Sequence, residues 1–260
     1  MLFTAKMDQA WCTRELDSTR RKGKAMKLSD VLTIGATAAF AVGVEAQMVV
    51  LDGFSGPSTS LTQTGLGSKG DYQPTDHGFI RGTVAAITLT GPASASLYVE
   101  TGSGPFGGLG CSTSGGTSIG KLTLTYGDFG NVNNPELHLD CRASGIGVEL
   151  GGFRADLAVN LDVKVFSGSP ANYWEYSGTL PFGPSDWAVD GTAFLPAVGS
   201  PSLADINSIV FTFSVGPEYD FAFQGIGARG QMVPEPGQCA AIAAVGLLGF
   251  AAWRRIQTRA

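Results

Sequence analysis

A strict alternation of apolar and polar residues in the middle of the chain constrains its fold more than any other feature. Every second side chain is apolar at Leu157, Val159, Leu161, Val163 and Val165, and polar residues stand between most of them. Successive side chains of a β-strand point to opposite faces of a sheet. The segment is therefore predicted to be a strand with one buried and one solvated face.

Similar alternation recurs along the chain, separated by glycine- and proline-rich turns, and no long amphipathic helix pattern is present. The clearer predicted strands lie at 85–89, 122–126, 209–215 and 219–223, and weaker ones at 49–54, 96–101, 147–150, 173–180 and 187–194. Roughly ten strands suffice for two antiparallel sheets packed face to face. The predicted fold class is an all-β, jelly-roll-like antiparallel β-sandwich, flanked by an N-terminal signal helix and a C-terminal hydrophobic helix.

The N-terminal flank has the organisation of a signal peptide. Residues 31–44 are apolar and uncharged, and Lys27 precedes them. The run is too short to span a bilayer but has the length of a signal-peptide core. Val44 and Ala46 place small residues where cleavage before Gln47 requires them. Met26 opens this unit, so Met1 and Met26 both remain candidate starts.

The C-terminal flank combines a proline-containing segment, an apolar run and arginines. Val233, Pro234, Glu235 and Pro236 precede the uncharged residues 239–253, and Arg254 and Arg255 follow. Prolines cannot continue a helix or a sheet, so the first part is predicted to be extended and accessible. Fifteen residues of helix measure about 22 Å, less than the hydrocarbon core of about 30 Å, so spanning requires anchoring at the interface.

In this order, the three parts resemble the PEP-CTERM sorting tail of Gram-negative bacteria, although Gly237 stands where Ser or Thr is common and only two arginines are adjacent. The resemblance implies Sec export, transient inner-membrane anchoring, and recognition of Pro234, Glu235 and Pro236 by a membrane-embedded exosortase. Cleavage would then deliver the protein to the cell surface or an exopolysaccharide matrix. The predicted domains are a signal peptide at 1–46, a β-sandwich cargo at 47–230 and a sorting tail at 231–260.

Charge and cysteine content fit an exported cargo. Between Gln47 and Val233 there are seven basic and sixteen acidic side chains, a balance that disfavours nucleic-acid partners. Cys111 and Cys141 form an even pair that predicts a disulfide in an oxidising compartment, with two buried free thiols as the alternative. Residues 102–120, rich in Gly, Ser and Thr, are predicted to form a surface loop that this disulfide ties down.

No convincing catalytic constellation appears in the sequence. Residues 116–120 match G-x-S-x-G, but a predicted strand follows them, whereas a nucleophile elbow needs a helix. His77 and His138 are the two histidines, and exposed positions on the sheet or its loops explain them more simply than catalysis. Asp186 and Asp190 could form an acid/base pair, with solubility as the alternative. The chain is therefore predicted not to be an enzyme.

Two binding hypotheses remain. Calcium is a candidate ligand for loop carboxylates, with Asp52 and Asp220 as weak candidates, and no other cofactor is indicated. Trp174, Tyr176 and Trp187 could present aromatic faces to sugar rings, unless Trp174 belongs to the core. The predicted function is that of a structural or adhesive surface protein without catalysis. The alternative is an exported carbohydrate-binding or carbohydrate-active protein, with exopolysaccharide as its partner.

Overall fold

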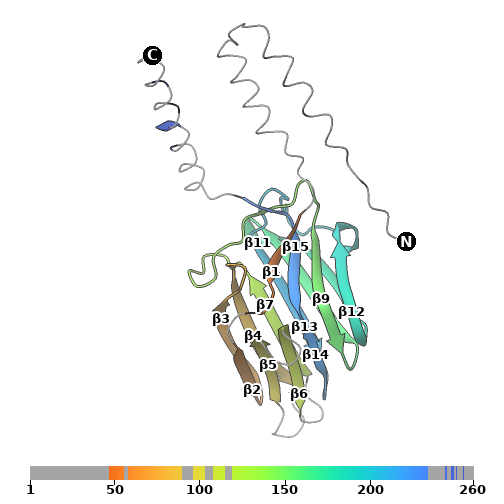
Figure 1. Ribbon diagram of the computed structural model, residues 1–260. Helices are drawn as coiled ribbons and strands as arrows, with labels where there is room; N and C mark the ends of the chain where they lie inside the picture. Colours follow the sequence, from red (N-terminus) through yellow and green to blue (C-terminus); the bar gives the residue numbers. More distant parts are fainter. Residues whose placement is uncertain are drawn as a thin grey trace, which may run out of the picture. The chain divides into compact units, whose positions relative to one another are not determined.

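The protein folds into an antiparallel β-sandwich (Figure 1). The computed structural model describes residues 47–55, 58–89, 96–102, 108–114 and 119–233, and places five further residues in helical conformation: Ala244, Leu247, Leu248, Phe250 and Arg254. The chain divides into two units, Met1–Val44 and Glu45–Ala260, and all described residues belong to the second.

One layer is an eight-stranded sheet. Its order is β1-β15-β9-β14-β6-β5-β2, and β12 pairs with β9. Strands β14 and β15 follow one another along the same edge of β9. The bounds are β1 Met48–Asp52, β2 Thr59–Thr64, β5 Ser96–Gly102, β6 Gly108–Ser114, β9 Gly147–Ala155, β12 Gly183–Asp190, β14 Asp220–Phe223 and β15 Gly225–Arg229.

The other layer is a six-stranded sheet with the order β11-β10-β13-β7-β4-β3. Its strands are β3 Gly67–Pro74, β4 Ile80–Leu89, β7 Ile119–Tyr126, β10 Val159–Ser167, β11 Ser169–Leu180 and β13 Ser208–Val215. A short ribbon of β8 Leu139–Asp140 and β16 Gln231–Met232 and a 3-10 turn, η2 Gly191–Ala193, complete the described elements.

The core lies between the two sheets and is built from the alternating apolar residues. On β10 the side chains of Val159, Leu161 and Val163 have no exposed surface. Phe213 of the six-stranded sheet stacks on Phe221 and Phe223 of the eight-stranded sheet, with ring centroids 5.2 and 5.4 Å apart. Burial of such rings is a major contribution to the stability of a sandwich.

The structure confirms the predicted all-β sandwich and its clearer strands, with three corrections. The predicted strand at 157–165 begins at Val159, and Leu157 is 44 % exposed. Part of the predicted 102–120 loop is β6, because β5 and β14 pair with it on both sides. The folded part extends beyond residue 230, since Gln231 and Met232 pair with β8.

The predicted terminal helices fall largely outside the described residues. The signal segment at 31–44 lies there, as do Pro234, Glu235, Pro236 and Arg255 of the sorting tail. Among the residues that are described, no helix is long and apolar enough to cross a membrane. Val233 ends the continuously described part of the chain, and its backbone N–H donates a hydrogen bond to the His138 carbonyl at 2.8 Å.

Candidate functional site

The outer face of the eight-stranded sheet carries an open groove of about 590 Å³. It crosses β5, β6, β14, β9 and β12, which are neighbours in the sheet. The alternation of β5 explains its lining: Leu97 and Val99 are buried in the core, so Tyr98 and Glu100 point outward. The sequence contains this alternation within the weak strand predicted at 96–101.

Small residues form the floor of this groove. Cross-strand pairing aligns Glu100, Gly110, Ala222, Arg154 and Pro184 in one row across the sheet. A side chain added at Gly110 would meet no atom within 4 Å. Because the middle of the row carries only Gly and Ala, the longer side chains at its two ends become the walls.

Acidic groups predominate in the groove. Glu100, Asp156 and Asp220 line it together with one basic residue, Arg154. Asp156 is held in place, since its Oδ1 accepts a hydrogen bond from the Asp220 backbone N–H at 2.9 Å. Burial raises the pKa of Asp220 above its ordinary value, and the charge of Asp156 raises it further.

An aromatic side chain stands at one wall. Tyr98 is 36 % exposed, and its hydroxyl donates a hydrogen bond to Glu100 Oε2 at 3.3 Å. Its pKa is raised by burial and by the charge of Glu100. The groove thus combines an exposed aromatic ring, carboxylate acceptors and a floor of small side chains. This combination is suited to binding the edge or face of a polar ring.

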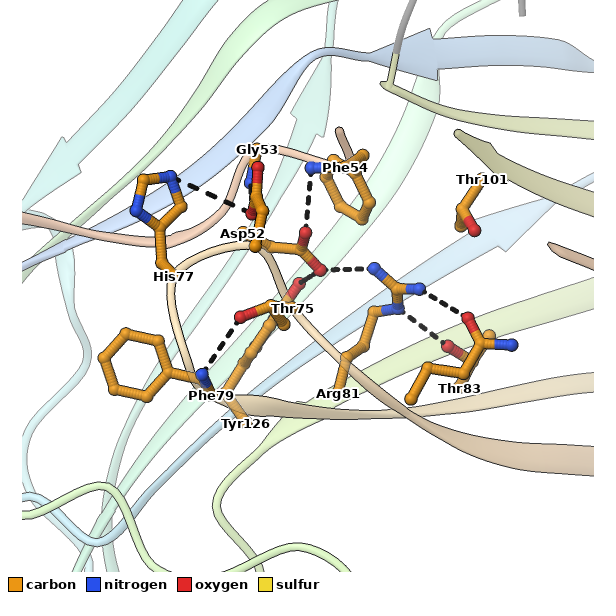
Figure 2. Close-up of polar contacts among 12 residues, drawn as sticks. Asp52, Gly53, Phe54, Thr75, His77, Phe79, Arg81, Thr83, Thr101 and Tyr126 are labelled. Atoms are coloured by element: carbon orange, nitrogen blue, oxygen red, sulfur yellow. Dashed lines mark hydrogen bonds and ion pairs between the residues drawn. The ribbon is translucent and has the colours of Figure 1, made fainter. Parts of the chain in front are cut away.

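A second polar cluster lies inside the sandwich. Asp52 of β1 and Arg81 of β4 form an ion pair, although they are only 1 % and 3 % exposed (Figure 2). The Tyr126 hydroxyl donates to Asp52 Oδ2 at 3.3 Å, and the Phe54 backbone N–H donates to Asp52 Oδ1 at 2.8 Å. The carboxylate of Asp52 is therefore bound by two side chains of the six-stranded sheet and by the backbone that follows β1.

The guanidinium of Arg81 is equally well satisfied. Its Nη2 donates to Gln73 Oε1 at 2.9 Å and its Nε donates to Thr83 Oγ1 at 3.2 Å (Figure 2). The Phe54 ring lies 5.0 Å from the guanidinium carbon, within the range of a cation–π contact. Burial raises the pKa of Asp52 and outweighs the opposing effect of Arg81.

This cluster is best explained as a structural link between the sheets. The pocket beside it measures only about 110 Å³, room for water-sized molecules. The weak calcium candidate Asp52 is already neutralised by Arg81, so a calcium ion there would have to displace a buried guanidinium. The other candidate, Asp220, contacts Asp156, and the described residues contain no group of three or more potential metal ligands.

The aromatic residues predicted to bind sugar pack toward the core. Trp174, Tyr176 and Trp187 are half-buried against it. The Tyr176 ring lies 5.4 Å from Trp187 and 6.2 Å from Phe194, so it links β11 of one sheet to β12 of the other. These residues close one edge of the sandwich, and the exposed platform predicted from them is not formed on the outer face.

The predicted acid/base carboxylates accept backbone hydrogen bonds, one between strands β12 and β9 and one at a 3-10 turn. Asp186 Oδ1 accepts a hydrogen bond from the Gly152 backbone N–H at 2.9 Å. Asp190 caps η2 by accepting from the Thr192 backbone N–H at 3.0 Å. Hydrogen bonds from Thr192 lower the pKa of Asp190.

Each of the two histidines is near a carboxylate. His138 Nδ1 is 3.0 Å from Asp205 Oδ1, and His77 Nε2 is 3.8 Å from Asp76 Oδ1. Asp76 also accepts a hydrogen bond from the Gly53 backbone N–H at 2.8 Å, which fixes the turn after β1. Both histidine side chains are nearly half exposed, at 45 % for His77 and 47 % for His138.

The predicted disulfide is wrong: Cys111 and Cys141 are free, buried thiols. Cys111 pairs with Phe221, which pairs with Ala155 at one end of β9. The Cys141 thiol donates to the Arg229 carbonyl at 3.0 Å, beside the pairing of Ala228 with Val148 near the other end of β9. Seven residues of strand separate these positions by about 23 Å, far beyond the reach of a disulfide.

The groove is the feature that sequence reasoning missed. Its walls come from strands far apart in the chain, and β6 had been assigned to a loop. The local signals are the alternation at 96–101, which places Tyr98 and Glu100 on one face, and that at 219–223, which does the same for Asp220 and Ala222.

Comparison with known proteins gives similarity at the level of fold alone. No family model and no curated protein matches the chain. The family 11 carbohydrate-binding module of a cellulosomal cellulase of Clostridium thermocellum is 16 % identical, with a TM-score of 0.39, over 74 % of this chain and 99 % of that one. The solution structure of CtCBM11 is 14 % identical, with a TM-score of 0.38, over 74 % of this chain and 100 % of that one. At this similarity neither carries a conclusion about function.

Proposed function

We propose that this chain is an exported bacterial surface or exopolysaccharide-matrix protein that binds carbohydrate without catalysis. Its jelly-roll-like sandwich would be the binding module, and the flanking signal peptide and PEP-CTERM-like tail would direct Sec export and exosortase processing. The observation that carries the binding part is the groove on the outer face of the eight-stranded sheet. This proposal replaces the platform of Trp174, Tyr176 and Trp187 with Tyr98 and its neighbours.

The chemistry of the groove supports a sugar ligand. A pyranose has apolar C–H faces and a rim of hydroxyl groups. The exposed ring of Tyr98 can contact such a face, and the carboxylates of Glu100 and Asp220 can accept hydrogen bonds from hydroxyls. The groove is open and has a floor of Gly110 and Ala222, so it leaves room for a ligand of several sugars.

The arrangement of the acidic groups favours binding over hydrolysis. Asp156 is engaged by the Asp220 backbone, and Glu100 accepts from the Tyr98 hydroxyl. Asp186 and Asp190, the predicted acid/base pair, accept backbone hydrogen bonds from Gly152 of β9 and from Thr192 of η2. A glycosidase requires one protonated and one ionised carboxyl group on opposite sides of the scissile bond, and these contacts do not point to such a pair.

The binding test is a calorimetric titration of the protein with oligosaccharides of several backbone types. Tyr98→Ala is expected to abolish or strongly weaken binding, and Gly110→Val is expected to do the same by filling the floor. Matched controls are Tyr72→Ala, an exposed tyrosine on the other sheet, and Gly151→Val, where an added side chain also meets open space. Retention of binding in both groove variants would overturn the proposed site.

The export part is tested separately by mass spectrometry of the protein from a Gram-negative host. Mature ends near Gln47 and just after Pro236 are expected. Recovery of the uncut chain from the cytosol would contradict export and processing, whatever the groove binds.

A further inference from the structure

We infer that the groove selects a polysaccharide whose sugars carry free amines, such as a de-N-acetylated glucosamine polymer. The inference rests on the proposed carbohydrate-binding function and adds a ligand class to it. It is carried by the charge of the groove and by where the carboxylates stand relative to Tyr98.

The charge of the lining is unbalanced. Three carboxylates, on Glu100, Asp156 and Asp220, accompany the single guanidinium of Arg154. Even with Arg154 paired to one of them, two negative charges remain at the groove. A ligand that carries ammonium groups would neutralise this excess, whereas a uronate or sulfated polymer would be repelled.

The position of the carboxylates matches the ring that the sugar would contact. Cross-strand pairing aligns Tyr98, Ser112 and Asp220 in one row. Two strand spacings separate Tyr98 from Asp220, about 10 Å between their backbones. Ser112 between them is small, so a sugar ring packed beside Tyr98 would direct its substituents toward Asp220 and Asp156.

The two aspartates form the negative end of this row. Their backbones are tied together, because the Asp156 N–H donates to the Asp220 carbonyl at 3.0 Å and the Asp220 N–H donates to Asp156 Oδ1 at 2.9 Å. Like charges held this close disfavour each other's ionised form. An ammonium group placed between them would relieve that repulsion, which a neutral hydroxyl cannot do.

The test compares oligomers of equal length with the same backbone, one of free glucosamine and one of N-acetylglucosamine. Calorimetry is performed at a pH at which the amine is protonated and the carboxylates are ionised. The free amine is expected to bind about tenfold more tightly, the effect of about two partly exposed charge pairs. Added salt should reduce this ratio.

The double variant Asp156→Asn/Asp220→Asn is expected to bring the ratio close to one. Asparagine keeps the acceptor oxygen that holds the Asp220 backbone, so the contact between the ends of β9 and β14 is retained. Asp162→Asn, on the outer face of the other sheet, is the matched control and should leave the ratio unchanged. Tyr98→Ala should weaken both oligomers.

The outcomes separate this inference from the proposed function. Equal or tighter binding of the N-acetylated oligomer, or of a neutral glucan, would overturn the amine preference and leave carbohydrate binding intact. Failure of all oligosaccharides to bind would overturn both. Tight binding of oligolysine that is unaffected by Tyr98→Ala would also overturn the inference, because the surface would then respond to charge alone.

Discussion

The buried cluster and the surface groove use the same types of charged group in opposite ways. Inside the sandwich, Asp52 and Arg81 are paired one to one, and neutral donors and acceptors complete their hydrogen bonds. In the groove, three carboxylates accompany the single guanidinium of Arg154. A buried charge must be compensated within the protein, whereas an open one can be left for a ligand. The comparison separates a structural cluster from a candidate site.

The largest expected effect follows from breaking the buried pair. Arg81→Ala leaves the carboxylate of Asp52 buried without its partner, and the free energy of unfolding should fall by about 3–5 kcal/mol. Denaturant unfolding measures this change. Arg142→Ala is the control: it removes an ion pair with Asp140 in which the arginine side chain is 69 % exposed, and it should cost far less.

The apolar double variant Asp52→Leu/Arg81→Met sharpens this prediction. Because it removes both charges, it should recover much of the stability lost in Arg81→Ala. A loss in Arg81→Ala no larger than in Arg142→Ala would contradict the structural role of the buried cluster.

A smaller effect is expected from removing one neutral donor. Tyr126→Phe deletes the hydroxyl that donates to Asp52, and because the ring is fully buried no water replaces it. The cost should be about 1–2 kcal/mol in the same unfolding experiment. Tyr72→Phe, whose hydroxyl lies on a residue that is 47 % exposed, should change little. Equal losses of stability in the two variants would contradict the buried position of the Tyr126 hydroxyl.

The smallest effect concerns the pH dependence of the groove. Burial and the charge of Asp156 raise the pKa of Asp220 in the folded state above its ordinary value of 3.8, so the folded protein holds this proton more tightly than the unfolded chain. The corresponding stability is present below pH 3.8 and is lost as the pH rises through the raised pKa. Asp220→Asn should remove this slope and be the more stable protein above that window, by no more than about 0.5 kcal/mol because the group is exposed. Denaturant unfolding at several pH values measures this dependence. If Asp220→Asn is less stable than the unmodified protein at neutral pH, the unfavourable ionisation of Asp220 is contradicted.

Sequence patterns predicted those strands that can be recognised without knowing which strands they pair with. The alternation of Val159, Leu161 and Val163 defines a buried face regardless of which strands pair with it. By contrast, β6 has glycines and serines at its outward positions, and only its pairing with β5 and β14 makes it a strand. Local propensity is a weak guide where neighbouring strands supply the hydrogen bonds.

The sites were harder to predict because their residues are distant in the chain. Asp52 lies 29 residues from Arg81 and 74 from Tyr126, and no local spacing relates them. The groove likewise joins residues from five strands. For Cys111 and Cys141, an even number suggested a disulfide, but cysteine counting carries no information about the distance between two strands.

The aromatic residues teach a related lesson. Alternation placed Trp174 and Tyr176 on one face of their strand, but it did not determine which face is the core. The structure places them inward, where Tyr176 contacts Trp187 and Phe194. The less conspicuous Tyr98 supplies the exposed aromatic ring of the groove, whereas Phe221, which also lines it, is buried.

The central claim, that the outer face of the eight-stranded sheet binds carbohydrate, is tested most directly by NMR titration of the isotope-labelled domain with glucosamine oligomers. The account predicts that shifts concentrate at the amides of Tyr98, Gly110, Ser112, Asp220 and Ala222. The side-chain indole signals of Trp174 and Trp187 should remain unchanged. Shifts confined to those indoles or to the six-stranded sheet, or no shifts with any oligosaccharide, would contradict it.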